Sequence, residues 1–265
     1  MNILITNDDG YGAWGIEAIA GKLAADHNVF IVAPEGNRSG SGMSVNVATP
    51  LQYRKMGDKR FTCSGSPVDC VIAGLKTDII NEPVDLVISG INHGPNLGTD
   101  ILYSGTCSAA TEATLMGVPA IAVSLNISPD MNWKDKDSWD FGPLADFVAD
   151  NLTNLMTLAR PSINPAAVGD KPGVFVNVNA FDFKEFRGVR LTNCCFMKHD
   201  GSAKLTLNGV NKNDFTSVFW GMHAEAARRE DSDYDACEEG FVSISAVLAE
   251  PVAEFRDIDD LTWIF

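Results

Sequence analysis

The sequence contains little of what several common functional classes require. Basic residues are scarce, with 20 Lys and Arg against 35 Asp and Glu, which gives a net charge of -15. Such an acidic chain is not expected to bind a nucleic-acid backbone or an anionic membrane as its main partner. No apolar run approaches the roughly 20 residues of a membrane-spanning helix. No basic stretch precedes the first apolar segment, so we predict no signal peptide and a cytoplasmic protein.

Metal-binding patterns of histidine and cysteine are missing as well. The chain has 6 cysteines, and none of them forms a C-x-x-C pair. Its 4 histidines, at positions 27, 93, 199 and 223, have no ligand spacing to the cysteines, which argues against a zinc site. Without an export signal, the cysteines are expected to be reduced thiols.

Two catalytic motifs are absent too. No Walker A motif occurs. The G-x-S-x-G elbow of serine hydrolases is also missing.

What is present is an alternation of apolar strands and amphipathic helices in 265 residues, of which 45% are hydrophobic. Strand, loop, helix and strand follow one another within about thirty residues at the start of the chain, as in a βαβ unit. The pattern predicts strands at 2–6, 29–33, 86–89, 120–125 and 174–179, helices at 16–26, 67–75, 106–116 and 143–160, a hairpin at 51–63, and further strands at 189–196, 203–208 and 241–248.

These elements predict an α/β fold in two parts. Residues 1–185 should form a three-layer, Rossmann-like catalytic domain with a mostly parallel sheet. Residues 186–265 should form a C-terminal appendage rich in β-hairpins. Because two-stranded hairpins are marginal alone, the appendage should pack on a partner subunit and assemble a homo-oligomer.

Ligands of open parallel sheets bind at the carboxyl ends of the strands. The first such loop contains the adjacent carboxylates Asp8 and Asp9, which would repel each other and resist burial unless a cation lay between them. Hard oxygen ligands of this kind suit Mg²⁺, Mn²⁺ or Ca²⁺. The alternative is structural, with either aspartate capping the helix that follows.

Two further loops carry polar and glycine residues. In residues 37–42, Ser39 could add an oxygen to a metal site and Arg38 could pair with a phosphate, although such a segment, taken alone, is more often a flexible surface loop than a site. In residues 89–106, Asn92 ends a strand and can reach a metal held by the first loop. His93 is most simply a loop histidine, with a general-acid role as the alternative.

The segment Ser104-Gly105-Thr106 begins a helix. Its free N–H groups and two hydroxyls would make an anion site, whereas the alternative is an ordinary helix cap. Together the three loops favour metal-assisted hydrolysis of a phosphoester.

The same residues resemble a known family. The matching segments are I-L-I-T-N-D-D-G at 3–10, A-P-E-G-N-R-S-G at 33–40, G-S-P-V-D-C-V at 65–71, S-G-I-N-H-G-P-N-L-G at 89–98, Y-S-G-T at 103–106 and G-V-P-A-I-A-V-S at 117–124. Taken together and in order, they resemble the survival protein SurE family of metal-dependent 5′-nucleotidases. V-N-V-N at 176–179 fits more weakly.

The resemblance implies a phosphatase that acts on nucleoside 5′-monophosphates and, in some members, on short polyphosphate. It implies one divalent cation per subunit, Mg²⁺ or Mn²⁺, held by Asp8, Asp9, Ser39 and Asn92. Asp8, Asp9 and Asn92 would then be catalytic, and one of the aspartates would orient or deprotonate the attacking water. The residues implied to bind the substrate phosphate are Asn96, Ser104, Gly105 and Thr106.

The resemblance also implies a homodimer or homotetramer built by exchange of C-terminal elements. After the E-G-F element this chain departs from the family pattern, with S-I-S-A-V-L in place of S-I-T-P-L. Two rival functions remain: a non-catalytic Mg²⁺-binding receiver-like module and a sugar-nucleotide-binding transferase. A receiver would need a third aspartate and a late lysine that the comparable strand ends do not supply.

Overall fold

The computed structural model describes residues 1–126, 139–162, 171–199, 203–207, 215–219, 224–227 and 231–251. Its centre is a nine-stranded sheet with the strand order β3-β4-β2-β1-β5-β6-β7-β13-β8. The strands are β1 (Asn2–Thr6), β2 (Asn28–Pro34), β3 (Tyr53–Gly57), β4 (Arg60–Cys63), β5 (Leu86–His93), β6 (Ala120–Asn126), β7 (Val174–Phe181), β8 (Val189–Leu191) and β13 (Val242–Leu248). Neighbouring strands from β4 to β7 are all parallel, and β3 and β13 pair antiparallel with β4 and β7. The prediction of a mostly parallel sheet is confirmed.

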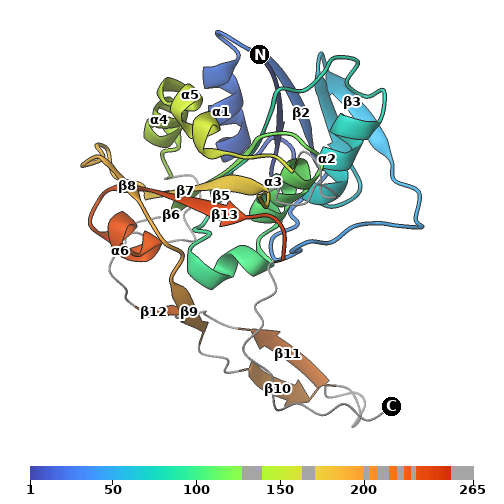
Figure 1. The fold of residues 1–265 in the computed structure, drawn as a ribbon. Helices are drawn as coiled ribbons and strands as arrows, with labels where there is room; N and C mark the ends of the chain where they lie inside the picture. The colour runs from blue at the N-terminus through green and yellow to red at the C-terminus, as the bar shows by residue number, and fades with distance from the viewer. Residues whose placement is uncertain are drawn as a thin grey trace, which may run out of the picture.

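Helices cover both faces of this sheet (Figure 1). One face carries α1 (Trp14–Leu23), α4 (Gly142–Asp150) and α5 (Leu152–Leu158), and the other carries α2 (Pro67–Lys76) and α3 (Gly105–Leu115). Each helical layer forms its own apolar core with the strand face beneath it. The three-layer arrangement expected from the sequence is therefore present.

Local sequence signals explain where most elements begin and end. Ser66 caps α2 in a reciprocal capping box with Asp69, and Pro67 occupies the first turn. The single helix predicted at 143–160 is instead two helices, because Asn151 leaves the helical conformation with φ -109° and ψ 14°. No helix in the described ranges is long and apolar enough to cross a membrane.

The segments after residue 186 do not all stand apart from the sheet. β8 and β13 belong to it, so the placement of the 241–248 strand in the appendage is wrong. The strand predicted at 189–196 divides into β8 and β9 (Phe196–His199), and β9 pairs with β12 (Ala224–Ala227). β10 (Ala203–Leu207) pairs with β11 (Phe215–Phe219), and α6 (Asp233–Glu238) precedes β13. Much of the predicted appendage lies outside the described residues, and a division at residue 185 stays a prediction.

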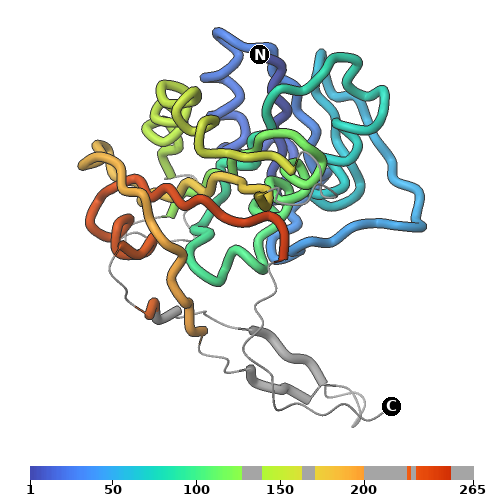
Figure 2. Tube along the Cα trace, in the orientation of Figure 1, coloured from blue at the N-terminus to red at the C-terminus, as the bar shows by residue number. Residues whose placement is uncertain are grey.

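Segments far apart in the sequence meet at the carboxyl end of the sheet. The loops after β1, β2 and β5 lie there, as expected for parallel strands. The 3₁₀ helix η1 (Gly98–Tyr103), which the sequence pattern treats as loop, lies beside the residues that lead into β9 (Figure 2). This edge therefore combines the glycine-rich loops with a strand from the C-terminal third.

Candidate active site

A tight turn after β1 presents the two adjacent aspartates. Asn7 closes the turn, since its Nδ2 donates to the Gly10 carbonyl (3.0 Å) and its Oδ1 accepts from the Gly10 N–H (3.3 Å). Asp8 is only 3% exposed. The Asp8 carbonyl accepts from the Arg38 N–H (2.6 Å), which joins this loop to the one after β2.

The carboxylate of Asp8 lies at the N-terminus of α3. The Thr106 hydroxyl donates to Asp8 Oδ1 (2.8 Å), and the Thr106 backbone N–H donates to Oδ2 (3.3 Å). Burial and the neighbouring charge of Asp9 nevertheless raise the pKa of Asp8 to about 6, in spite of the opposing effect of the Thr106 bonds. The structural alternative from the sequence, a cap on the helix that follows, is not realised, because α1 has no side-chain cap and Asp8 instead accepts from Thr106 in the first turn of α3. The unfavourable burial remains, and a cation would relieve it.

Asp9 faces the histidine that follows Asn92. The His93 backbone N–H donates to Asp9 Oδ2 (3.0 Å), and His93 Nδ1 lies 3.4 Å from the same oxygen. The ring of His93 packs against Trp139 and Phe141, with centroid distances of 5.3 and 4.6 Å. His93 is therefore a buried partner of Asp9, which leaves Asp9 Oδ1 for another ligand.

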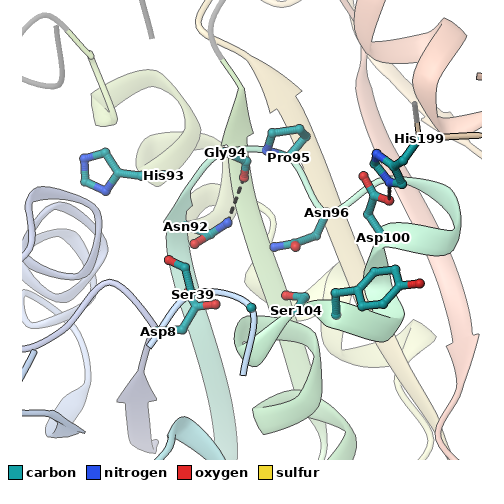
Figure 3. A pocket seen from close by; sticks show the side chains of 12 residues that line it. Asp8, Ser39, Asn92, His93, Gly94, Pro95, Asn96, Asp100, Ser104 and His199 are labelled. Atoms are coloured by element: carbon teal, nitrogen blue, oxygen red, sulfur yellow. Dashed lines mark hydrogen bonds and ion pairs between the residues drawn. The ribbon is translucent and has the colours of Figure 1, made fainter. Parts of the chain in front are cut away.

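Asn92 and Ser39 lie next to Asp8 (Figure 3). Asn92 Nδ2 donates to the Gly94 carbonyl (2.9 Å), so its Oδ1 is the atom left to bind a cation. Ser39 is exposed, and its backbone N–H donates to Asn37 Oδ1 (3.0 Å). The guanidinium of the neighbouring Arg38 donates to the Ser64 carbonyl (2.8 Å), and Arg38 is not part of the cavity lining.

Two asparagine side chains of β7 hold Asn96 in position. Its backbone N–H donates to Asn179 Oδ1 (2.9 Å), and its carbonyl accepts from the side chains of Asn177 (2.8 Å) and Asn179 (3.1 Å). Its own Nδ2 donates to Ser124 Oγ (2.7 Å). The weakly matching V-N-V-N segment thus supports a predicted phosphate residue, a role that only the three-dimensional pairing reveals.

Ser104 and Thr106 differ in what they can offer a ligand. Ser104 caps α3 by accepting from the Cys107 N–H (3.0 Å), and its hydroxyl hydrogen remains available. Thr106 is fully buried and directs both of its donors to Asp8. Gly105 lies against Asp8, since a Cβ there would be 2.8 Å from Asp8 Cβ. Ser104 therefore keeps a donor free, whereas Gly105 and Thr106 contact Asp8, and the assignment of all three residues to the substrate phosphate stays a prediction.

A cavity of about 260 Å³ collects these groups at the sheet edge. It is lined by Asp8, Ser39, Gly40, Asn92, His93, Gly94, Pro95, Asn96, Asp100, Tyr103, Ser104 and His199. Of the predicted site residues, Asp8, Ser39, Asn92, Asn96 and Ser104 share this lining, and Asp9 contacts it through His93. Asp100 and His199 were not expected from the sequence, where they are 99 residues apart.

The donor set fits a hard divalent cation. Two carboxylates, an amide oxygen and a hydroxyl are the kinds of ligand that Mg²⁺ and Mn²⁺ prefer. Asp8 supplies the observation that supports this, because its buried carboxylate has a raised pKa that a cation would lower. No group of three or more His, Cys, Asp and Glu side chains is positioned to hold a metal within the described part of the chain. Neutral oxygens would therefore have to complete the site.

The parallel sheet and the oxygen-lined cavity at its carboxyl edge define the class. This is a three-layer α/β protein with its ligand site where Rossmann-like folds place theirs. The sequence model described as "Survival protein SurE" matches residues 3–200, and the chain belongs to that family.

The similar proteins agree with this assignment. The chain is 43% identical over 267 residues to the 5′-nucleotidase SurE of Desulfitobacterium hafniense, and the match spans 94% of this chain and 92% of the relative. It is 33% identical over 272 residues to the 5′-nucleotidase SurE of Clostridium beijerinckii, spanning 100% and 99%. The crystal structure of the SurE protein from Aquifex aeolicus superposes with a TM-score of 0.74 at 29% identity, covering 95% of both chains.

Proposed function

We propose that the chain is a 5′-nucleotidase that hydrolyses nucleoside 5′-monophosphates to nucleoside and phosphate with the help of one divalent cation. The relatives at 33% and 43% identity carry the name 5′-nucleotidase over nearly their full length. The observation that carries the proposal is the juxtaposition of Asp8, Asn92 and Ser39 with hydrogen-bond donors in one cavity. Hydrolysis of a phosphate monoester is promoted by a cation on one side of the phosphate and by hydrogen-bond donors to the phosphate oxygens on the other.

The cation would be held by Asp8, Asp9, Ser39 and Asn92, with Mg²⁺ and Mn²⁺ as the candidates. A bound divalent ion polarises a phosphoryl oxygen and lowers the pKa of a bound water. Asp9 Oδ1 would orient or deprotonate the attacking water, since its Oδ2 is already engaged by His93. The Ser104 hydroxyl and the Asn96 side chain would donate to or orient the phosphate oxygens. Thr106 would keep the Asp8 carboxylate in place.

Phosphate release from 5′-AMP tests the proposal directly. The parent should be active with Mn²⁺ or Mg²⁺ and inactive in excess chelator, and short polyphosphate can be tested in the same assay. Asp9→Asn should keep the fold and lose most of the activity, because it removes half of the negative charge offered to the cation. Asp58→Asn, at the exposed tip of the β3–β4 hairpin, is the matched control and should behave like the parent. Full activity of Asp9→Asn at low metal would contradict the assignment.

The assembly and the location remain proposals that rest on the family resemblance. We expect a cytoplasmic homodimer or homotetramer in which part of the chain after residue 186 packs on a partner subunit. Light scattering on the purified protein should give at least a dimer. An active, stable monomer would contradict this expectation.

A further inference from the structure

One aromatic side chain lines the cavity and has no part in the roles assigned so far. Tyr103, the last residue of η1, belongs to the lining and is nevertheless 65% exposed. Among the lining residues it is the one phenylalanine, tyrosine or tryptophan. A residue that lines a cavity and stays this exposed lies at the opening, where its ring offers apolar surface to a ligand that enters.

The backbone of Tyr103 is fixed against the loop that carries Ser39. The Tyr103 carbonyl accepts from the Gly42 N–H (3.1 Å). A Cβ at Gly42 would lie 3.4 Å from the Leu102 carbonyl oxygen, so this loop packs directly on η1. The next residue, Ser104, lines the same cavity and caps α3. The ring therefore begins at a set place relative to a predicted metal ligand and a predicted phosphate donor.

The other end of η1 is held by the C-terminal part of the chain. The buried carboxylate of Asp233 accepts from the Gly98 N–H (2.6 Å) through Oδ2 and from the Cys195 N–H (3.0 Å) through Oδ1. The Met197 backbone N–H donates to Thr99 Oγ1 (3.0 Å), and the Thr99 hydroxyl donates to the Met197 carbonyl (3.2 Å). Because η1 is held at both ends, a ligand that binds the ring would not have to order this segment first.

The cavity is small for a whole nucleotide. Its volume is about 260 Å³, whereas sites that enclose a drug-sized ligand typically measure ~300–1,000 Å³. A phosphate near Asn96 and Ser104, with the cation beside Asp8, would occupy the enclosed part. The ribose separates that phosphate from the base, so the base would extend toward the opening, where Tyr103 lies.

We propose that Tyr103 stacks on the nucleobase of the substrate and so makes the site prefer nucleotides to other phosphate monoesters. This inference rests on the proposed function, and it concerns the part of the substrate that is remote from phosphorus. Every nucleobase has a π-face, and a stack on an aromatic side chain requires no particular pattern of hydrogen bonds. Tyr103 is therefore a specificity-determining residue for nucleotides as a class rather than for one base.

Burial of the ring against a second copy of the chain is the rival explanation for its exposure. Leu102, the preceding residue in η1, is 75% exposed and lines a separate groove with Met43, Ile101 and Phe175. Tyr103 does not line that groove, and Leu102 does not line the cavity. Replacing each residue in turn therefore separates binding of a base from burial of η1 in an interface.

Kinetics on substrates with and without a base test the proposal. With saturating Mn²⁺, 5′-AMP would be compared with ribose 5-phosphate, which keeps the phosphate and the sugar but has no base. The parent should have the lower KM for 5′-AMP. Tyr103→Ala should raise this KM by about 5- to 100-fold, the range for one base–aromatic stack. The kcat should change little, because a stack remote from phosphorus binds the ground state and the transition state alike.

For ribose 5-phosphate, KM and kcat of Tyr103→Ala should stay those of the parent. Tyr103→Phe keeps the ring and should keep the low KM for 5′-AMP, and Tyr103→Gln serves as the second variant if Tyr103→Ala does not fold. Adenosine should inhibit hydrolysis of ribose 5-phosphate less strongly in Tyr103→Ala than in the parent, with inhibition by inorganic phosphate unchanged. Leu102→Ala is the matched control and should behave like the parent on both substrates.

Three results would overturn the stacking assignment and leave the proposed function intact. They are equal losses of Tyr103→Ala on the two substrates, a loss of the same size in Leu102→Ala with a lower mass in light scattering, and equal KM values of the parent for the two substrates. A parent that hydrolyses neither substrate with metal would instead refute the proposed function.

Discussion

Replacing Asp8 by asparagine is expected to stabilise the metal-free protein relative to the parent as pH rises, while removing most phosphatase activity. Burial and the charge of Asp9 raise the pKa of Asp8 in the folded protein from 3.8 to about 6. A carboxyl whose pKa is raised by folding contributes stability in its protonated form. That contribution is complete below the unfolded pKa and is lost as pH rises through the folded pKa.

The expected magnitude follows from the size of the shift. Going from 3.8 to about 6 is roughly 2 pKa units, and each unit corresponds to 1.36 kcal/mol, so about 3 kcal/mol is lost on ionisation. Asparagine stays neutral at every pH and does not undergo this loss. Any constant difference between asparagine and protonated aspartate, such as an altered bond to Thr106, cancels when two pH values are compared.

Urea unfolding in excess chelator, at about pH 4 and about pH 7.5, measures this difference. The unfolding free energy of Asp8→Asn relative to the parent should increase by about 2.4 kcal/mol between the two pH values, since the unfolded carboxyl is already partly ionised at pH 4. Asp69→Asn is the control of opposite sign. Burial raises the pKa of Asp69, but hydrogen bonds from Asn46 and Ser66 outweigh this and leave the pKa lowered. Asp69 therefore contributes stability above its ordinary pKa, and its variant should fall behind the parent as pH rises.

A difference between Asp8→Asn and the parent that is the same at both pH values would refute this reasoning. It would mean that the folded protein does not penalise the Asp8 charge. Adding Mn²⁺ at 100 times its Kd should stabilise the parent by about 2.7 kcal/mol through mass action. Asp8→Asn should gain less, because it has lost a ligand.

Three further outcomes test neighbouring contacts. Gly105→Ala should weaken Mn²⁺ binding in a calorimetric titration, because its methyl group would lie 2.8 Å from Asp8 Cβ; unchanged affinity would show that the loop adjusts. Thr106→Ala should lower metal affinity or kcat by about 10- to 100-fold, since it removes the donor to Asp8, whereas Thr106→Ser should be mild. Ser66→Ala should lower the unfolding free energy by about 1 kcal/mol without changing kcat, and a change in kcat would contradict a purely structural cap.

The central sheet was predictable because its strands are buried on both faces and so appear as uninterrupted apolar runs. β1, β2, β5, β6 and β7 all overlap the predicted segments. The helix predicted over 143–160 shows the limit of periodicity, since the apolar spacing continues across Asn151 where the backbone does not.

The placement of β13 could not be predicted in this way. An apolar strand shows that it is buried but not which strand it pairs with, and β13 joins β7 from more than sixty residues away, as the pairing of Ser243 with Asn179 shows. η1 and α6 were missed because each is only six residues long, too short for a helical repeat to appear.

The candidate site, like the sheet, was predictable in one part and not in another. The position of Asp8, Ser39 and Asn92 at one sheet edge follows from strand ends alone, and their assignment as metal ligands stays a prediction. The contact of Thr106 with Asp8, 98 residues away, and that of His199 with Asp100 depend on how helices and late strands pack. Because His199 has no metal-ligand spacing to other residues, the sequence did not indicate that it lies in the cavity.

Hydrogen bonds join Thr99 to Met197 and Gly98 to Asp233. The cavity is therefore lined by segments from two separate parts of the sequence. One wall is made by loops of the parallel sheet, and the other wall is completed by a strand that enters almost a hundred residues later. The second wall depends on contacts that the oxygen cluster around Asp8 does not share. Substitutions confined to residues 195–198, which hold the second wall in place, should therefore shift that wall while the groups around Asp8 keep their positions.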